Sequence, residues 1–150
     1  VLFVLLVEIG KSLAFARKSQ AEMDAVHEQT ESLMKNPKTT VAIKAHLKTF
    51  AGKLKPADEP APSFDSASEI LSGIETSLES ADVAPNEPQK SYVARASAQI
   101  AGLANAWQIL QRSDLVSLNS ELAAAGLPPL NVPSPEKLKV EPAKGGEELP

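Results

Sequence analysis

Hydrophobic residues recur at intervals of three and four along the first part of the chain. Between Glu8 and Met34 this spacing gives a helix one apolar face, and most charged side chains fall elsewhere on the helix. The apolar positions are Ile9, Leu13, Ala16, Met23, Val26, Thr30 and Leu33. The pattern predicts a long amphipathic helix. It should end at Asn36-Pro37, because proline lacks an amide hydrogen and restricts the residue before it.

A second apolar stripe follows this break. Its members are Ile43, Leu47, Phe50 and Leu54, which lie at i, i+4, i+7 and i+11. Thr39 or Thr40 is suited to cap the start of this helix. Because the break is short, residues 1–54 are predicted to form an antiparallel helical hairpin. Residues 55–65 are rich in proline and are predicted to form an extended linker.

Residues 66–127 are predicted to form a three-helix segment that completes the bundle. The first of these helices should open at Ser66, because Ser66 and Glu69 have the spacing of a capping box. Its inward positions are predicted to be Ile70, Ile74, Leu78 and Ala81.

The next predicted helix starts near Glu87, with Asn86 as its N-cap. Its apolar positions alternate by threes and fours, which predicts a core-packing seam and places the only tryptophan in the core. The seam consists of Val93, Ala96, Ile100, Leu103, Trp107 and Leu110. A last helix is predicted from about Ser113 to Gly126, where glycine supplies the left-handed conformation that ends helices.

The fold class predicted from these elements is all-α. Aromatic residues make up only 4% of the chain, which disfavours strands, and 43% hydrophobic residues suffice for one core. We therefore expect an antiparallel helical bundle of four to five helices. Residues 128–150 alternate proline and glycine with lysine and glutamate, so they are predicted to form an extended or disordered tail.

Composition and charge exclude several classes of function. The formal net charge of -4 lacks the basic footprint of a nucleic-acid binder, so we expect no nucleic acid among the partners. The chain has no cysteine, which rules out disulfides, thiolate nucleophiles and cysteine-ligated metals. The sequence shows no nucleophile elbow, phosphate loop or dinucleotide turn. We expect no catalytic residues and no cofactor, and predict that the chain is not an enzyme.

The two histidines do not fit a metal motif. His27 begins a zinc-protease pattern, but Glu31 occupies the position of the second histidine. Asp24 and His27 have the carboxylate–histidine spacing of di-iron bundles, but a second such pair is missing because Ile43 precedes His46 at that spacing. We predict no bound metal.

One segment carries a clear charge asymmetry. Six lysines and no acidic residue lie between Ser32 and Ala57. These are Lys35, Lys38, Lys44, Lys48, Lys53 and Lys55. They fit contact with anionic head groups or with an acidic protein surface, and they equally fit a solvated face that balances acidic neighbours, which we favour.

The chain opens with seven apolar residues, Val1–Val7. No basic flank precedes them, so the pattern is not that of a signal peptide. Glu8 and Lys11 follow, and the run is far shorter than the roughly 20 residues that cross a bilayer. We expect that the chain starts within a longer protein, with either a β-domain or a membrane segment before Val1.

Motifs in the second half of the chain resemble a known family. They are Glu79–Pro85, Trp107, Leu110, Asp114-Leu115, Leu118-Asn119, Leu122 and Ala124–Leu130. They resemble the C-terminal helical region of large bacterial sortilin-like, BNR-repeat β-propeller proteins, many of them labelled glycosyl hydrolases. There, helices ending in a DL-x-x-LN-x-x-L…AGLPP segment follow a β-propeller and a small β-domain. The resemblance spans about Ile70–Leu130 and implies no catalytic residue, because the propeller is not in these residues.

Three functions are compatible with this pattern. The one we favour is a non-catalytic structural and protein-interaction module, the C-terminal part of a larger exported bacterial protein. It would be periplasmic or extracellular, and its partner would be the rest of its own chain or a larger complex. The second is a membrane-associated accessory subunit of a membrane protein complex, anchored near its N-terminus. The third is a fragment of a glycoside hydrolase-like protein.

Overall fold

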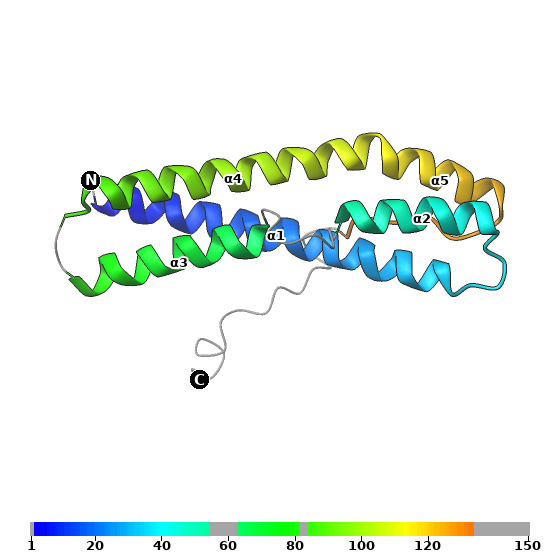
Figure 1. The fold of residues 1–150 in the computed structure, drawn as a ribbon, viewed down its shortest axis with the longest axis horizontal. Coiled ribbons are helices and arrows are strands. Elements are labelled where there is room, and N and C mark those ends of the chain that lie inside the picture. Colours follow the sequence, from blue (N-terminus) through cyan, green and yellow to red (C-terminus); the bar gives the residue numbers. More distant parts are fainter. Residues whose placement is uncertain (1, 55–62, 82–83, 134–150) are drawn as a thin grey trace.

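The computed structural model describes residues 2–54, 63–81 and 84–133, which form five α-helices (Figure 1). They are α1 (Leu2–Met34), α2 (Val41–Leu54), α3 (Phe64–Ala81), α4 (Glu87–Arg112) and α5 (Asp114–Ala124). These residues contain no strand, so the predicted all-α class is confirmed.

Two long arms organise the bundle. One is α1, and the other is α4 continued by α5 (Figure 1). Near one end α3 packs on both α1 and α4, whereas at the other end α2 packs on α1 and α5. Within the described ranges, α2 and α3 do not contact each other. The molecule is therefore two three-helix segments placed end to end, because α1 is long enough for two shorter helices to lie along it.

Each segment has its own hydrophobic core. The α3-end core contains Leu5, Ile9, Leu13, Ala16, Phe64, Ala67, Leu71, Leu78, Val93, Ala96, Ile100 and Ala104. The α2-end core contains Val26, Leu33, Ile43, Leu47, Phe50, Leu54, Trp107, Leu115, Leu118, Leu122, Leu127 and Leu130. Met23 of α1 packs against both cores. The shared arms thus join the two cores into one structure.

The predicted seam of α4 is buried along most of its length. Val93, Ala96, Ile100 and Trp107 are buried, whereas Leu103 and Leu110 are only half-buried at the edges of the cores. Ala104 takes the inward position that the strict three–four alternation assigns to Leu103. A straight helix has 3.6 residues per turn, so the buried stripe drifts away from a 3.5-residue pattern along a helix of this length.

The break between α1 and α2 lies where the sequence predicts it, around Asn36-Pro37. Thr40 caps α2, since its Oγ1 accepts a hydrogen bond from the Ile43 amide at 3.3 Å. Thr39 instead closes the end of α1, because its hydroxyl donates to the Leu33 carbonyl at 2.6 Å. At the other end, α1 already begins at Leu2, before the predicted start at Glu8.

The predicted start of α3 is wrong by two residues. The cap is Ser63, whose Oγ accepts from the Ser66 amide at 3.1 Å, while the Ser63 amide donates to the Ser66 hydroxyl at 3.3 Å. Ser66 is therefore the third residue of the helix, and 64–65 belong to α3 and not to the linker. Residues 55–62 of the predicted linker lie outside the described residues.

The inward face of α3 also differs from the prediction. Ile70 is 44% exposed, and the core is filled by Phe64, Ala67, Leu71 and Leu78. Ile74 packs at the edge of the α3-end core, and the side chain of Ala81 lies outside the described part. Because Phe64 enters the helix, the stripe of Phe64, Ala67 and Leu71 buries more apolar area than one centred on Ile70.

The start of α4 is confirmed. The Asn86 side chain accepts from the Gln89 amide at 2.8 Å, and the Gln89 side chain accepts from the Asn86 amide at 2.9 Å. This reciprocal pair is a capping box, and Pro88 sits in the first turn, where a missing amide hydrogen has no cost.

Candidate interaction surfaces

The end of α5 is closed by a glycine in the left-handed conformation. Gly126 has a φ of 72°, and the Leu127 amide reaches back to the Leu122 carbonyl at 2.8 Å. The Gly126 amide bonds to the Ala123 carbonyl at 3.1 Å, which completes a Schellman motif. Leu127 is buried beside Leu122 in the α2-end core, as this motif favours. The predicted stop at Gly126 is confirmed.

Residues 127–133, here called the return segment, lie against the bundle. The Asn119 side chain holds the backbone of Leu130 with two hydrogen bonds, of 2.7 Å from the Leu130 amide and 3.0 Å to its carbonyl. Gln29 of α1 holds the backbone of Asn131 in the same way, with two bonds of 2.8 Å. Leu130 is 1% exposed. The first residues of the predicted tail are therefore extended and docked, while 134–150 lie outside the described residues.

Two side-chain contacts join α2 to α5 at a shallow open groove between them. His46 and Glu121 approach to 2.9 Å, and Lys53 and Asp114 to 2.5 Å. Lys53 lowers the pKa of Asp114 below its ordinary value, mainly by donating a hydrogen bond to it, with help from the Ser113 hydroxyl and against the effect of partial burial. These two side-chain contacts therefore hold the two helices together.

Replacing Lys53 with methionine should make the free energy of unfolding depend less on pH in the acidic range. The folded pKa of Asp114 lies below its ordinary value of 3.8, so its contribution to stability is present above that value and is lost as the pH falls through the lower folded pKa. Both side chains are partly exposed, so the effect should be at most about 1 kcal/mol. Urea unfolding between about pH 2 and pH 7 measures it. Lys48→Met is the control, and identical acid limbs in wild type and Lys53→Met would contradict the assignment.

The lysines of the lysine-rich segment have different surroundings. Lys35, Lys38, Lys44 and Lys48 are exposed, Lys53 is paired with Asp114, and Lys55 lies outside the described residues. Of the large apolar side chains in the described part of this segment, only Val41 is strongly exposed, at 85%. Interfacial membrane helices combine basic residues with a broad apolar face, and only the basic residues are evident here.

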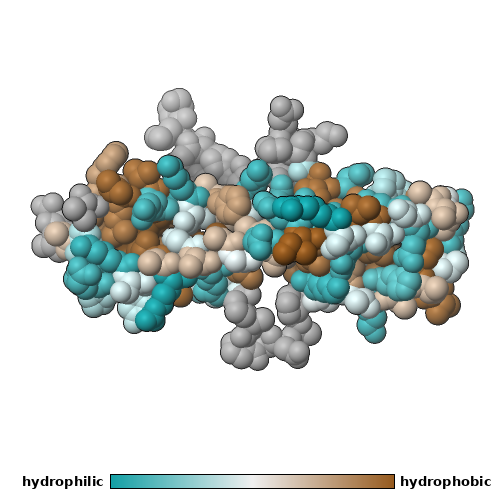
Figure 2. All heavy atoms as spheres, turned by 90° about the horizontal axis from the view of Figure 1, so that it is seen from above, coloured by the Kyte–Doolittle hydropathy of each residue, from teal (hydrophilic) through white to brown (hydrophobic). Residues whose placement is uncertain are grey.

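A broader apolar surface lies at the opposite end of α1. Phe3, Val7, Gly10 and Ala14 share one side of the helix, at i, i+4, i+7 and i+11, and all are exposed. We call these four residues the α1 outer face. Phe3 is 78% exposed and Val7 39%. Figure 2 shows hydrophobic side chains on the surface near the end of the bundle that holds the N-terminus.

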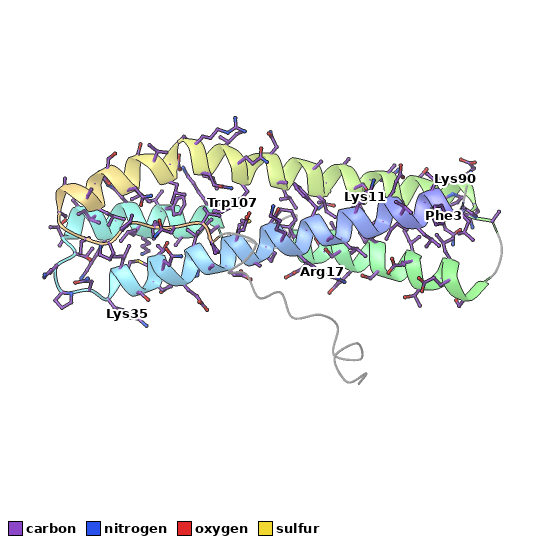
Figure 3. All side chains as sticks on the ribbon, turned by 180° about the vertical axis from the view of Figure 1, so that it is seen from behind. Phe3, Lys11, Arg17, Lys35, Lys90 and Trp107 are labelled. Carbon is purple, nitrogen blue, oxygen red and sulfur yellow. The ribbon has the colours of Figure 1, made fainter. Side chains whose placement is uncertain are left out.

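The α1 outer face is flanked on one side by further apolar and charged residues. Val4 and Phe15 are 59% and 42% exposed. Glu8 and Lys11 lie between them along the helix and border a shallow groove against Lys90 of α4. In Figure 3, Phe3 and Lys90 lie at the same end of the bundle, and Lys11 follows further along α1.

Sequence reasoning missed this surface, although its signal is visible in the chain. Treating Val1–Val7 as one apolar run hides its periodicity and places the start of the predicted helix only at Glu8. Extending the helical pattern back to Phe3 reveals a second stripe beside that of the buried Ile9 and Leu13. One apolar stripe of α1 is therefore buried in the cores, and the other is exposed.

Metal-binding and membrane-spanning features are absent from the described part of the chain. His27 lies 3.7 Å from Glu31, and no group of three or more histidine, aspartate or glutamate side chains converges there. None of the helices between residues 2 and 124 is long and apolar enough to cross a bilayer.

Comparison of the chain with family models, with curated proteins and with solved structures finds no match. The similarity to the helical region of β-propeller proteins therefore stays a prediction.

Proposed function

We propose that this chain is a non-catalytic helical interaction module that docks through the α1 outer face. The observation that carries the proposal is the exposed apolar side of α1, where Phe3 and Val7 face solvent. A surface helix normally turns polar side chains outward, and each exposed apolar Å² is unfavourable by about 25 cal/mol relative to burial. Covering this face would therefore be favourable.

Gly10 belongs to the same exposed face. A glycine inside a helix is less stable than alanine by about 1 kcal/mol. A Cβ added at Gly10 would meet no atom within 4 Å, so packing inside the chain does not require a glycine there. The open side of Gly10 therefore leaves room for a partner, as the open sides of Gly52, Gly73 and Gly102 also would.

Four polar side chains outside the α1 outer face help to hold the bundle together. His46 and Lys53 bridge α2 to α5, and Asn119 and Gln29 anchor the return segment. These contacts are packing roles, which is compatible with the proposed function.

The proposal includes the larger protein to which this module would belong. The residues that resemble the β-propeller family have packing roles in this fold: Asn119 binds the Leu130 backbone, and Gly126 ends α5. This is compatible with a helical module attached to a larger exported protein, whose own remainder or complex supplies the partner. The alternative function, an accessory subunit of a membrane complex, is favoured by the exposed apolar residues next to Lys11. The two functions assign different partners to Phe3.

A photo-crosslinking probe tests docking directly. Benzoylphenylalanine replaces Phe3 with a similar ring in the full-length gene product, and irradiation in the native cells should give a discrete adduct that mass spectrometry maps to one defined segment. The same probe at Val116, which is 57% exposed on α5, is the matched control and should give none. Absence of an adduct at position 3, or equal adducts at both positions, would contradict the proposed function.

A further inference from the structure

We infer that the partner of the α1 outer face is a second copy of this chain, paired through antiparallel α1 helices. The inference rests on the proposed function, because it names the molecule that covers the same surface. Pairing about a two-fold axis requires that one surface complement itself. The α1 outer face meets this requirement in shape and in charge.

The shape argument comes from the order of large and small residues. Along the face, two bulky residues, Phe3 and Val7, are followed by two small ones, Gly10 and Ala14. When two such helices run antiparallel, Phe3 lies opposite Ala14 of the second copy and Val7 lies opposite its Gly10. Each bulky side chain then fills the space beside a small one, and the two-fold axis repeats each of these contacts once.

A parallel pair would lack this fit. Phe3 would face Phe3, and Gly10 would face Gly10, so the helices would be held apart at one end and leave a gap at the other. Close-packed interiors tolerate such voids poorly. The open space beyond Gly10 is therefore matched by the Val7 side chain of an antiparallel copy.

The charge argument comes from the flank of the face. In the antiparallel register, residues on the same flank of the two helices meet, and Glu8 comes within one helical turn of Lys11 of the second copy. The symmetric pair forms at the same time. Val4 and Phe15 of opposite copies meet by the same geometry and bury their exposed apolar surface. Both side chains of the charge pair are exposed in the single chain.

The size of the contact sets the strength expected of the dimer. From Phe3 to Ala14 the face extends about 16 Å at about 1.5 Å per residue. A face of about three helical turns buries less area than a standard interface of about 800 Å² per partner, so the dimer should dissociate on dilution. Sedimentation equilibrium over micromolar to submillimolar concentration should show a monomer–dimer transition.

Substitution of the outer glycine tests the shape argument. Gly10→Gln adds a side chain where the single chain has open space, so the bundle should remain folded, but the added atoms collide with Val7 of the second copy. The dissociation constant should rise at least about 10-fold, a clearly resolved difference. Gly102→Gln is the matched control, because Gly102 is also an exposed helical glycine with open space around it. Unchanged dimerisation of Gly10→Gln would overturn the inference.

Charge reversal tests the flank. Glu8→Lys and Lys11→Glu should each weaken the dimer, since like charges then meet across the axis, and the double variant should restore it. Helicity measured by circular dichroism should stay constant throughout, since both residues are exposed. Failure of the double variant to recover dimerisation would contradict the register.

Introduced cysteines test orientation, because the natural chain has none. Differently tagged Val7→Cys and Gly10→Cys chains are mixed and oxidised gently. Antiparallel pairing predicts mostly disulfides between the two different variants, whereas parallel pairing would give each variant disulfides with itself. A Val116→Cys chain should form no disulfide-linked dimer, because Val116 lies on α5 and outside the α1 outer face.

The outcomes separate this inference from the proposed function. If the wild-type chain stays monomeric at every concentration but the Phe3 probe gives an adduct with another segment or protein, the inference fails and the docking function stands. If the monomer binds vesicles of phosphatidylcholine and phosphatidylserine through Phe3, a membrane is the occupant and the inference fails. If the Phe3 probe gives no adduct, both fail.

Discussion

Replacing Trp107 with alanine should lower the free energy of unfolding by about 3–5 kcal/mol, the usual effect of truncating a buried aromatic residue to alanine. Trp107 is 2% exposed and belongs to the α2-end core. Its Nε1 donates a hydrogen bond to Glu22 Oε1 of α1 at 3.1 Å. The substitution therefore leaves a cavity between the two long arms and removes the partner of a half-buried carboxylate.

Urea unfolding followed by far-ultraviolet circular dichroism measures this effect without depending on tryptophan fluorescence. Trp107→Phe separates the two contributions, because it keeps an aromatic ring in the core and removes only the donor to Glu22. It should be less destabilising than Trp107→Ala. A melting temperature of Trp107→Ala equal to that of the wild type would refute the core assignment.

Local features of this fold were predictable because local chemistry determines them. The three–four spacing placed Ile9, Leu13 and Val26 in the core, and the structure buries all three. The capping box at Asn86 and the stop at Gly126 follow from side chains and backbone conformations within a few residues. Such features depend little on what the rest of the chain does.

Features that depend on long-range packing were missed. Periodicity indicates that a helix has an apolar face, but not which helices meet, so the division into two three-helix segments could not be derived. The inward face of α3 was misjudged because including Phe64 shifts the buried stripe away from Ile70. The α1 outer face was missed because treating the first seven residues as one apolar run hides their helical periodicity.

The return segment illustrates the same limit. Most of this segment belongs to the predicted tail 128–150, whose prolines and glycines alternate with lysine and glutamate and predict an extended or disordered chain. Leu130 nevertheless enters the α2-end core, and side chains from two helices, Asn119 of α5 and Gln29 of α1, satisfy the neighbouring backbone groups. Asn119 is 11 residues away and Gln29 more than 100, so their pairing with this segment leaves no periodic signal in the sequence.

Replacing Leu130 with alanine should destabilise the bundle by about 2–5 kcal/mol, as for other fully buried leucines. A tail that merely hugged the surface would predict almost no effect. Leu130 is 1% exposed and packs in the same core as Trp107, although it follows the last helix. Urea unfolding of the variant measures the difference, and Pro129→Ala, at an exposed neighbouring position, is the matched control.

Hydrogen exchange identifies the mechanism of this loss. The Leu130 amide donates to Asn119 Oδ1 at 2.7 Å and should be protected in the wild type. Asn119→Ala removes this acceptor while keeping Leu130, so it should expose the amide and cost about 1–3 kcal/mol, the penalty for leaving buried backbone groups unpaired. If both variants unfold like the wild type and the Leu130 amide exchanges freely in all three, the return segment is not part of the folded core. If the losses appear as expected, α5 and the return segment unfold as one unit. That unit attaches the α5 end of the second arm to α1.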